Sequence, residues 1–151
     1  MPSQLAAIID GIAAQLATIP DLKKVVVHRP QQIGSVYPMV FFNSLALDYP
    51  ETTYGEMTIG YDPVAYVVLA PIDAKDEAVT VRLFDLVPKI LEVLGHDLDA
   101  HGALDRSSGT SDGQVLLTAA EDGTLPIAGH LYHVIRLTFR VIETFTYEYT
   151  L

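Results

Sequence analysis

The stretch LYHVIRLTFRVIETFTYEY, residues 131–149, decides the fold of this chain. Its odd positions from Ile135 to Val141 are apolar, whereas the even positions between them include Arg136 and Arg140. Because successive side chains of a β-strand point to opposite faces, this alternation predicts a strand with one buried face. Strands usually have about 5–6 residues. A strand of this length either bends between two sheets or pairs in part beyond its own subunit.

The sequence before this strand predicts a hairpin. The runs VLLTAA (115–120) and AGHLYHV (128–134) flank EDGTLPI, in which Asp122-Gly123 is a strong turn signal. We therefore expect the chain to reverse at this dipeptide before it enters the closing strand. Residues 97–113 are rich in Asp, Gly, Ser and His, and we expect a mobile loop there, not a link to a second domain.

A second long apolar run lies nearer the middle of the chain. Residues 64–71, VAYVVLAP, are almost continuously apolar, which is typical of a strand buried on both faces. Asp62-Pro63 indicates a turn just before this run, and we expect residues 48–62 to form a loop with irregular strand. Shorter strand-like runs are expected at 22–30 and 36–42.

Two segments have the apolar spacing of amphipathic helices. The first ends before Pro20, and its apolar face comprises Leu5, Ile8, Ile9, Ile12, Ala13, Leu16 and Ile19. The second spans 74–94, and Pro88 within it is expected to cause a kink. Its apolar face comprises Val79, Leu83, Leu86, Val87, Ile90 and Leu94. These patterns predict a single α+β domain over residues 1–151: a mixed, mainly antiparallel sheet, an N-terminal helix and a second, Pro-kinked helix packed on it, and a long C-terminal strand.

The composition indicates a packed core and a strongly negative surface. Half of the residues are apolar and 19% are charged, the formal net charge is −10, and cysteine is absent. The missing cysteines exclude disulfides and thiolate zinc sites, and the negative charge disfavours a tight grip on nucleic acid. The apolar runs are too short to cross a bilayer. Asp10 within the first apolar segment argues against a signal peptide.

No grouping of residues indicates an active site. His130 and His133 are three residues apart in a strand, so they point to opposite faces and do not share a metal. The polar cluster between His96 and His101 is better explained by solvated loop residues than by a metal site. The glycines form no phosphate-binding loop, and no serine lies in a nucleophile-elbow motif. We therefore expect no catalytic residue, no metal and no cofactor, in a protein that is not an enzyme.

Five stretches, covering nearly the whole chain, carry a family resemblance. They are the opening helix from Leu5 to Ile19, VVVHRP at 25–30, YPMVFF at 37–42, VAYVVLAPIDAKDEAVTVRLFDLVPKILEVL at 64–94, and RLTFRVIETFTYEY at 136–149. In this order they resemble the tail terminator proteins, also called tail completion or minor tail proteins, of long-tailed phages and phage-like gene transfer particles. The resemblance rests on the pattern of elements and not on a diagnostic motif.

The resemblance implies an α+β protein that forms a hexameric ring. Such a ring caps the tail-tube protein, ends tube polymerisation and presents the surface that joins the head–tail connector, while DNA passes through its lumen only as cargo. The implied location is the head-proximal end of the virion tail, after assembly in the host bacterial cytoplasm, with no membrane partner. The acidic balance agrees with this function, since a channel through which DNA slides should not hold phosphates tightly. The family has no catalytic residues to carry over.

The candidate interface residues come from the distribution of charge and tyrosine. We expect Arg136 and Arg140, on the polar face of the closing strand, to pair across a subunit boundary with acidic residues of the 48–62 stretch. The acidic residues are Asp48, Glu51 and Glu56, and the tyrosines that add contact area are Tyr54, Tyr61, Tyr147 and Tyr149. Ordinary strand composition, which favours aromatic residues, also accounts for these tyrosines.

Two other functions stay open at this point. A head–tail connector or stopper protein of the same kind of particle would share the size and the acidity. A cellular α+β domain that binds a small molecule or acts as an enzyme, dimeric through its long strand, would instead carry a concave and mostly apolar pocket.

Overall fold

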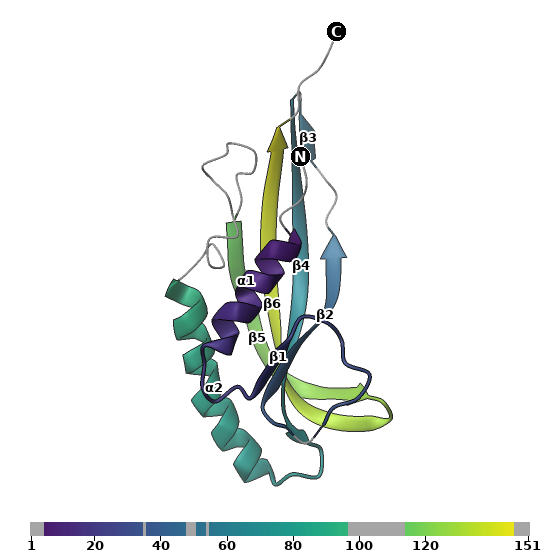
Figure 1. The fold of residues 1–151 in the computed structure, drawn as a ribbon, viewed down its shortest axis with the longest axis vertical. Helices are drawn as coiled ribbons and strands as arrows, with labels where there is room; N and C mark the ends of the chain where they lie inside the picture. Colours follow the sequence, from purple (N-terminus) through teal and green to yellow (C-terminus); the bar gives the residue numbers. More distant parts are fainter. Residues whose placement is uncertain (1–4, 35, 48–50, 54, 97–113, 147–151) are drawn as a thin grey trace.

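The computed structural model describes residues 5–34, 36–47, 51–53, 55–96 and 114–146 (Figure 1). Its elements, in chain order, are α1 (Leu5–Ala17), β1 (Lys24–Val26), β2 (Met39–Leu47), β3 (Glu51–Thr53), β4 (Glu56–Pro71), α2 (Asp76–His96), β5 (Gln114–Ile127) and β6 (His130–Thr146). Strands β1 and β2 are parallel and the other pairs are antiparallel. The predicted α+β class, with a mixed and mainly antiparallel sheet, is therefore confirmed.

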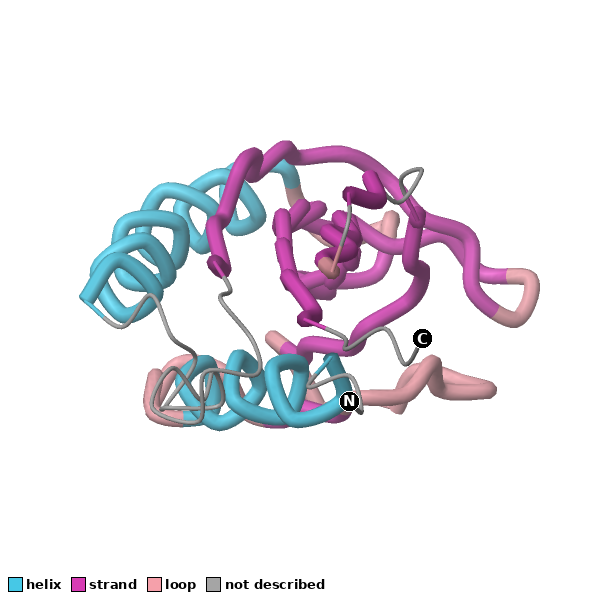
Figure 2. Tube along the Cα trace, turned by 90° about the horizontal axis from the view of Figure 1, so that it is seen from above, coloured by secondary structure: helices cyan, strands magenta, loops and turns pink. Residues whose placement is uncertain are grey.

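The long closing strand β6 lies inside the sheet. The strand order is β1-β2-β4-β6-β5, and β3 pairs with β4 beside the end of β2. Strand β6 pairs with β4 from Tyr132 to Thr146 and with β5 from His130 to Ile142. The described part of β6 thus has neighbours along its whole length within its own chain. It lies in one sheet, which twists and curls (Figure 2). Its last residues, 143–146, pair with β4 alone, so pairing with a second subunit there stays a prediction.

The main core lies between the sheet and the two helices. Helix α1 crosses one face of the sheet and α2 packs beside it (Figure 1). The helices bury an apolar face each against the odd-numbered positions of β6, as the periodicities predicted; the deepest side chains are Ile8, Ile12, Leu16, Leu86, Ile90, Ile135, Leu137 and Phe139. Each such side chain stabilises the fold by about 1.5–3 kcal/mol, which makes this core the principal source of stability.

A smaller second core lies on the opposite face of the sheet. It comprises Met39, Phe41, Val68, Ile127, Tyr132 and Val134. Because Val67 and Leu69 belong to the main core while Val68 belongs to the second, the prediction that 64–71 is buried on both faces is confirmed. In β6, Val134 packs in the second core and Ile135 packs in the main core. The buried side of this strand therefore switches from one face of the sheet to the other between these two residues.

An ion pair joins Asp21, in the loop after α1, to Lys89 of α2. The Lys89 ammonium donates hydrogen bonds to the carboxylates of Asp21 and Asp85. The hydrogen bond from Lys89 holds the pKa of Asp21 below its usual value, against the opposing effect of desolvation. The pKa of Lys89 is raised mainly by its hydrogen bond to Asp21 and, to a smaller extent, by its hydrogen bond to Asp85.

Two predicted turns are wrong, for the same physical reason. Strand β4 runs from Glu56 through Asp62-Pro63 without a turn, so that most of the expected 48–62 loop is strand. Pro63 is tolerated because the β4–β6 register has no pair between Tyr61 and Val64, where its missing N–H would interrupt the ladder. Cross-strand pairing outweighs a local turn preference here.

The hairpin between β5 and β6 also turns at a different place from the predicted one. Asp122 and Gly123 lie within β5, opposite Ile135 and Val134, and the chain reverses at Ala128-Gly129. Both turn residues have positive φ, 52° and 81°, as a two-residue hairpin turn of type I′ requires. The later turn lets Ile127 reach the second core, which a reversal at 122–123 would not allow.

The strand expected at 22–30 is confined to Lys24–Val26, and the strand expected at 36–42 spans Met39–Leu47. The proline positions agree with the sequence. Helix α1 ends before Pro20, α2 contains Pro88, and β2 begins directly after Pro38. The loop expected at 97–113 lies outside the described residues. Neither described helix combines the length and the apolar character that crossing a lipid bilayer requires.

Candidate functional site

The two candidate arginines lie on the face of the sheet that the helices leave uncovered. Arg136 and Arg140 occupy even positions of β6, and the odd positions beside them point into the main core. Arg136 is exposed, and the register places Glu121 of β5 and Tyr66 of β4 on either side of it. This position leaves the Arg136 guanidinium accessible to a second protein chain.

Arg140 has a partner that the sequence did not predict. Its Nη1 donates to both carboxylate oxygens of Asp62, at 3.0 and 3.1 Å, from the neighbouring strand β4. Both side chains are about 30% exposed, so this pair is partly screened by solvent. The expected pairing of Arg140 across a subunit boundary stays a prediction, and it would have to share this guanidinium with Asp62.

Two of the acidic candidates lie in β3 and at the start of β4. Glu51 is in β3 opposite Thr58, and Glu56 begins β4 opposite Thr53 and Thr146. Asp62 is six residues further along β4, which corresponds to about 20 Å of strand. The Cα register therefore separates Glu56 from the level of Arg140 by about 20 Å along the sheet. The contact between the two groups across a subunit boundary stays a prediction.

The tyrosine candidates are only partly described. Tyr61 is half-buried and packs against the main core of its own chain. Its ring is therefore held by its own subunit, and only its exposed part is available to a neighbour. Four further candidates lie outside the described residues: Asp48, Tyr54, Tyr147 and Tyr149.

An exposed apolar stripe on α2 was missed from the sequence. Val81, Phe84 and Leu91 are 63%, 72% and 51% exposed, and Pro88 between them is also exposed. Their spacing of three and seven residues places them on one side of the helix, away from the buried face. The signal was present, because α2 has more apolar residues than one buried face accommodates. Exposed apolar patches of this kind mark surfaces that contact other molecules.

Strand β5 forms one edge of the sheet, and β1 forms the other. Among the described residues, β5 pairs with β6 alone, which leaves the outer backbone groups of Gln114–Ile127 without a strand partner. The second half of this edge carries Glu121, Asp122 and Pro126, which oppose uncontrolled pairing with other strands. The first half, 115–120, has no charge and no proline, so it is the part of the edge on which another chain could align.

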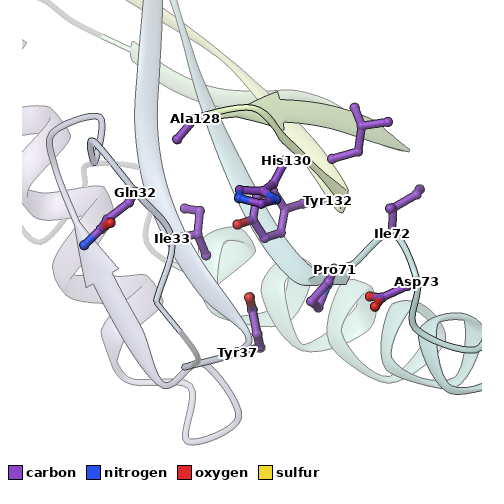
Figure 3. A pocket seen from close by; sticks show the side chains of 10 residues that line it. Gln32, Ile33, Tyr37, Pro71, Ile72, Asp73, Ala128, His130 and Tyr132 are labelled. Atoms are coloured by element: carbon purple, nitrogen blue, oxygen red, sulfur yellow. The ribbon is translucent and has the colours of Figure 1, made fainter.

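A cavity of about 510 Å³ lies where the second core reaches the surface (Figure 3). Three segments form it: the loop before β2, the end of β4 with the residues after it, and the turn between β5 and β6. Its lining residues are Gln32, Ile33, Tyr37, Pro71, Ile72, Asp73, Ala128, His130, Leu131 and Tyr132. In Figure 3 Tyr37 points toward Tyr132 and His130, whereas Gln32 points away. None of these residues was predicted as a site, because they come together only through the fold.

The described residues offer no grouping of three or more His, Asp or Glu side chains that could hold a metal ion. Within the described residues, two buried polar atoms, Asn43 Oδ1 and His133 Nε2, have no hydrogen-bond partner. They lie on different strands, β2 and β6. The described surface thus carries an apolar stripe, an open strand edge, two arginines and several cavities.

Comparison with models of known protein families gave no match. A search of curated proteins found no relative at a significant level of similarity.

Proposed function

We propose that this chain is a structural protein of a phage-like particle that assembles into a ring, caps the tail tube, ends its polymerisation and provides the surface for head joining. The observation that carries the proposal is the uncovered apolar stripe of α2. Val81, Phe84 and Leu91 expose more than half of their surface in the isolated chain. Burial of such side chains against a neighbour is worth about 1.5–3 kcal/mol for each fully buried residue.

The distribution of the contact surfaces is compatible with a ring. The acidic end of the β3–β4 hairpin and the arginines of β6 lie about 20 Å or more apart along the sheet. In a head-to-tail arrangement, the acidic end of one chain contacts the arginines of the next. Repetition of such a contact gives a ring if its rotation closes. A pair of chains related by a twofold axis would form the same contact twice, so the mass of the protein in solution decides between the two arrangements.

The charge of the chain supports the proposed passage of DNA. The formal net charge is −10, and the described surface carries few basic side chains beside its many acidic ones. Phosphates bind proteins mainly through Lys and Arg, with release of counterions. A ring of such subunits would repel DNA from its walls and let it slide through the lumen as cargo.

The first test is the mass of the purified protein in solution, measured by light scattering behind a sizing column. Six copies of a 16.5 kDa chain have a mass of 6 × 16.5 = 99 kDa, and a peak at this mass is the expected result. The second test adds the ring to polymerising tail-tube protein, whose tubes should then stop growing. A stable dimer that carries a small molecule after purification contradicts the proposal and favours a cellular binding domain.

A further inference from the structure

The cavity near Tyr37 has an aromatic wall. The rings of Tyr37 and Tyr132 lie with their centroids 6.4 Å apart and their planes at 41°, and the His130 side chain lies beside Tyr132 (Figure 3). Tyr132 is buried in the second core, which fixes the wall in place. The face of an aromatic ring carries negative charge density and attracts cations.

The tyrosine at the centre of this wall stays neutral at physiological pH. Burial, together with the nearby Tyr132 and Asp73, raises the pKa of Tyr37 above its usual value near 10. A neutral phenol offers a ring face and a hydroxyl that donates or accepts a hydrogen bond. The wall therefore presents π-electrons and polar tips and no fixed charge of its own.

The charge balance of the cavity is negative. Asp73 is a lining residue, whereas neither Lys nor Arg is found among the described residues that form the cavity. Arg82 lines two other cavities, and its guanidinium donates to the Leu69 carbonyl oxygen at 2.6 Å.

The rim of the cavity is apolar. Ile72 and Leu131 are 42% and 46% exposed, and the Ile72 N–H donates to the Leu131 carbonyl oxygen at 3.0 Å, which joins the two sides of the rim. Long basic side chains lay their aliphatic stems on apolar surface and carry the charge at the tip. The apolar rim can contact the aliphatic stem of such a side chain, and the aromatic and acidic interior can contact its charged tip.

We propose that this cavity receives a lysine or arginine side chain from a partner protein. The cationic tip lies against the rings of Tyr37 and Tyr132 with Asp73 as its counter-charge, and the aliphatic stem lies on Ile72 and Leu131. The cavity volume of about 510 Å³ is ample for one such side chain. This site does not depend on ring formation, since it is complete within a single chain.

The test is a ligand titration followed by NMR of ring-labelled tyrosine. The probes are N-acetyl-arginine amide and its neutral isostere N-acetyl-citrulline amide. The arginine probe should shift the signals of Tyr37 and Tyr132 and bind about three- to tenfold more tightly than citrulline. Equal binding of the two probes, or no shift at these tyrosines, overturns the proposal.

Variants separate the site from the general negative charge of the protein. Asp73→Asn should weaken binding of the arginine probe several-fold. Asp76→Asn removes a nearby exposed carboxylate outside this cavity and should leave binding of the probe unchanged. Equal losses in the two variants mean that the probe responds only to net charge and contradict the proposal.

Spermidine distinguishes a protein side chain from a free polyamine. The proposal expects spermidine to bind no more than about tenfold more tightly than the arginine probe, as its greater charge alone would explain. Much tighter binding of spermidine overturns the assignment to a partner protein. The light-scattering mass is independent of all these titrations, so failure of this site and failure of the proposed ring are separate results.

Discussion

The buried and exposed sides of α2 differ in what they do with the same kind of side chain. Leu86, Ile90 and their neighbours fill the space between the helix and the sheet, whereas Phe84 and Leu91, one or two residues away, face solvent. The buried side holds the subunit together. The exposed side adds nothing to the isolated fold, so its apolar character points to a contact with another chain. Adjacent residues of one helix therefore provide matched tests.

The largest effect is expected from Ile90→Ala on the buried side. Removal of this fully buried side chain should lower the free energy of unfolding by about 2–5 kcal/mol, because it deletes apolar contacts and leaves a cavity. Denaturant unfolding measures the change. The adjacent exposed residue gives the control, since Leu91→Ala should alter the unfolding free energy by no more than about 0.5 kcal/mol. Similar losses in both variants would erase the distinction between the two sides.

Phe84→Ser should act on assembly and leave the subunit fold unchanged. If Phe84 becomes buried against a neighbour, its loss should raise the protein concentration required for assembly by about tenfold or more per interface. Light scattering over a dilution series measures the shift, and circular dichroism monitors the fold. Phe84→Leu keeps an apolar side chain and should assemble nearly as well as the wild type. Unchanged assembly of Phe84→Ser would remove the stripe from the interface.

A smaller effect is expected from reversal of a single charge on the face that the helices leave uncovered. Reversal of Arg136 and Arg140 to Glu should prevent ring formation with an unchanged circular dichroism spectrum, but Arg140→Glu also places a carboxylate against Asp62 of its own chain. Arg136→Glu alone is therefore the sharper test. It should raise the concentration needed for assembly about two- to tenfold. Partial rescue by Glu56→Arg would locate the partner, whereas assembly at the wild-type concentration would exclude Arg136 from the interface.

The smallest effect on stability is expected from loss of the ion pair between Lys89 of α2 and Asp21. Lys89→Met removes the partner that lowers the pKa of Asp21, so wild type and variant should differ slightly in thermal midpoint at pH 7. Because the folded pKa of Asp21 lies below its unfolded value of about 3.8, this contribution is present above that value and disappears as the pH falls further. The raised pKa of Lys89 means that its contribution persists in mild alkali and is lost only above about pH 10.5. A difference that survives at pH 2 would assign the effect to packing.

The sequence predicted those parts of the fold that depend on periodicity. Both helices, the closing strand and the strand buried on both faces follow from the spacing of apolar residues. The turns at Asp62-Pro63 and Asp122-Gly123 were wrong because a local preference of the backbone is small beside the pairing of two long strands. Periodicity says which side of an element is buried, but it does not say where a hairpin reverses.

The site was harder to predict than the fold. The α2 stripe has a signal in the sequence, since Val81, Phe84 and Leu91 remain when the buried face has been assigned. The cavity has no such signal in the sequence. Tyr37, Asp73 and Tyr132 are far apart in the chain and meet only because β4 and β6 pair at the level of Pro71 and Tyr132. The pairing of Arg140 with Asp62 likewise follows from the β4–β6 register.

The position of β6 also bears on how the protein is made. This strand lies between β4 and β5, yet it is translated after both of them. Until it emerges from the ribosome, β4 lacks one of its neighbours and β5 has none, so β5 cannot join the sheet. Pairs such as Val67 with Ile135 also connect residues that are distant in the chain, which slows folding. A nascent chain therefore cannot present a finished surface to its partners, and assembly has to wait until β6 has been inserted into the sheet.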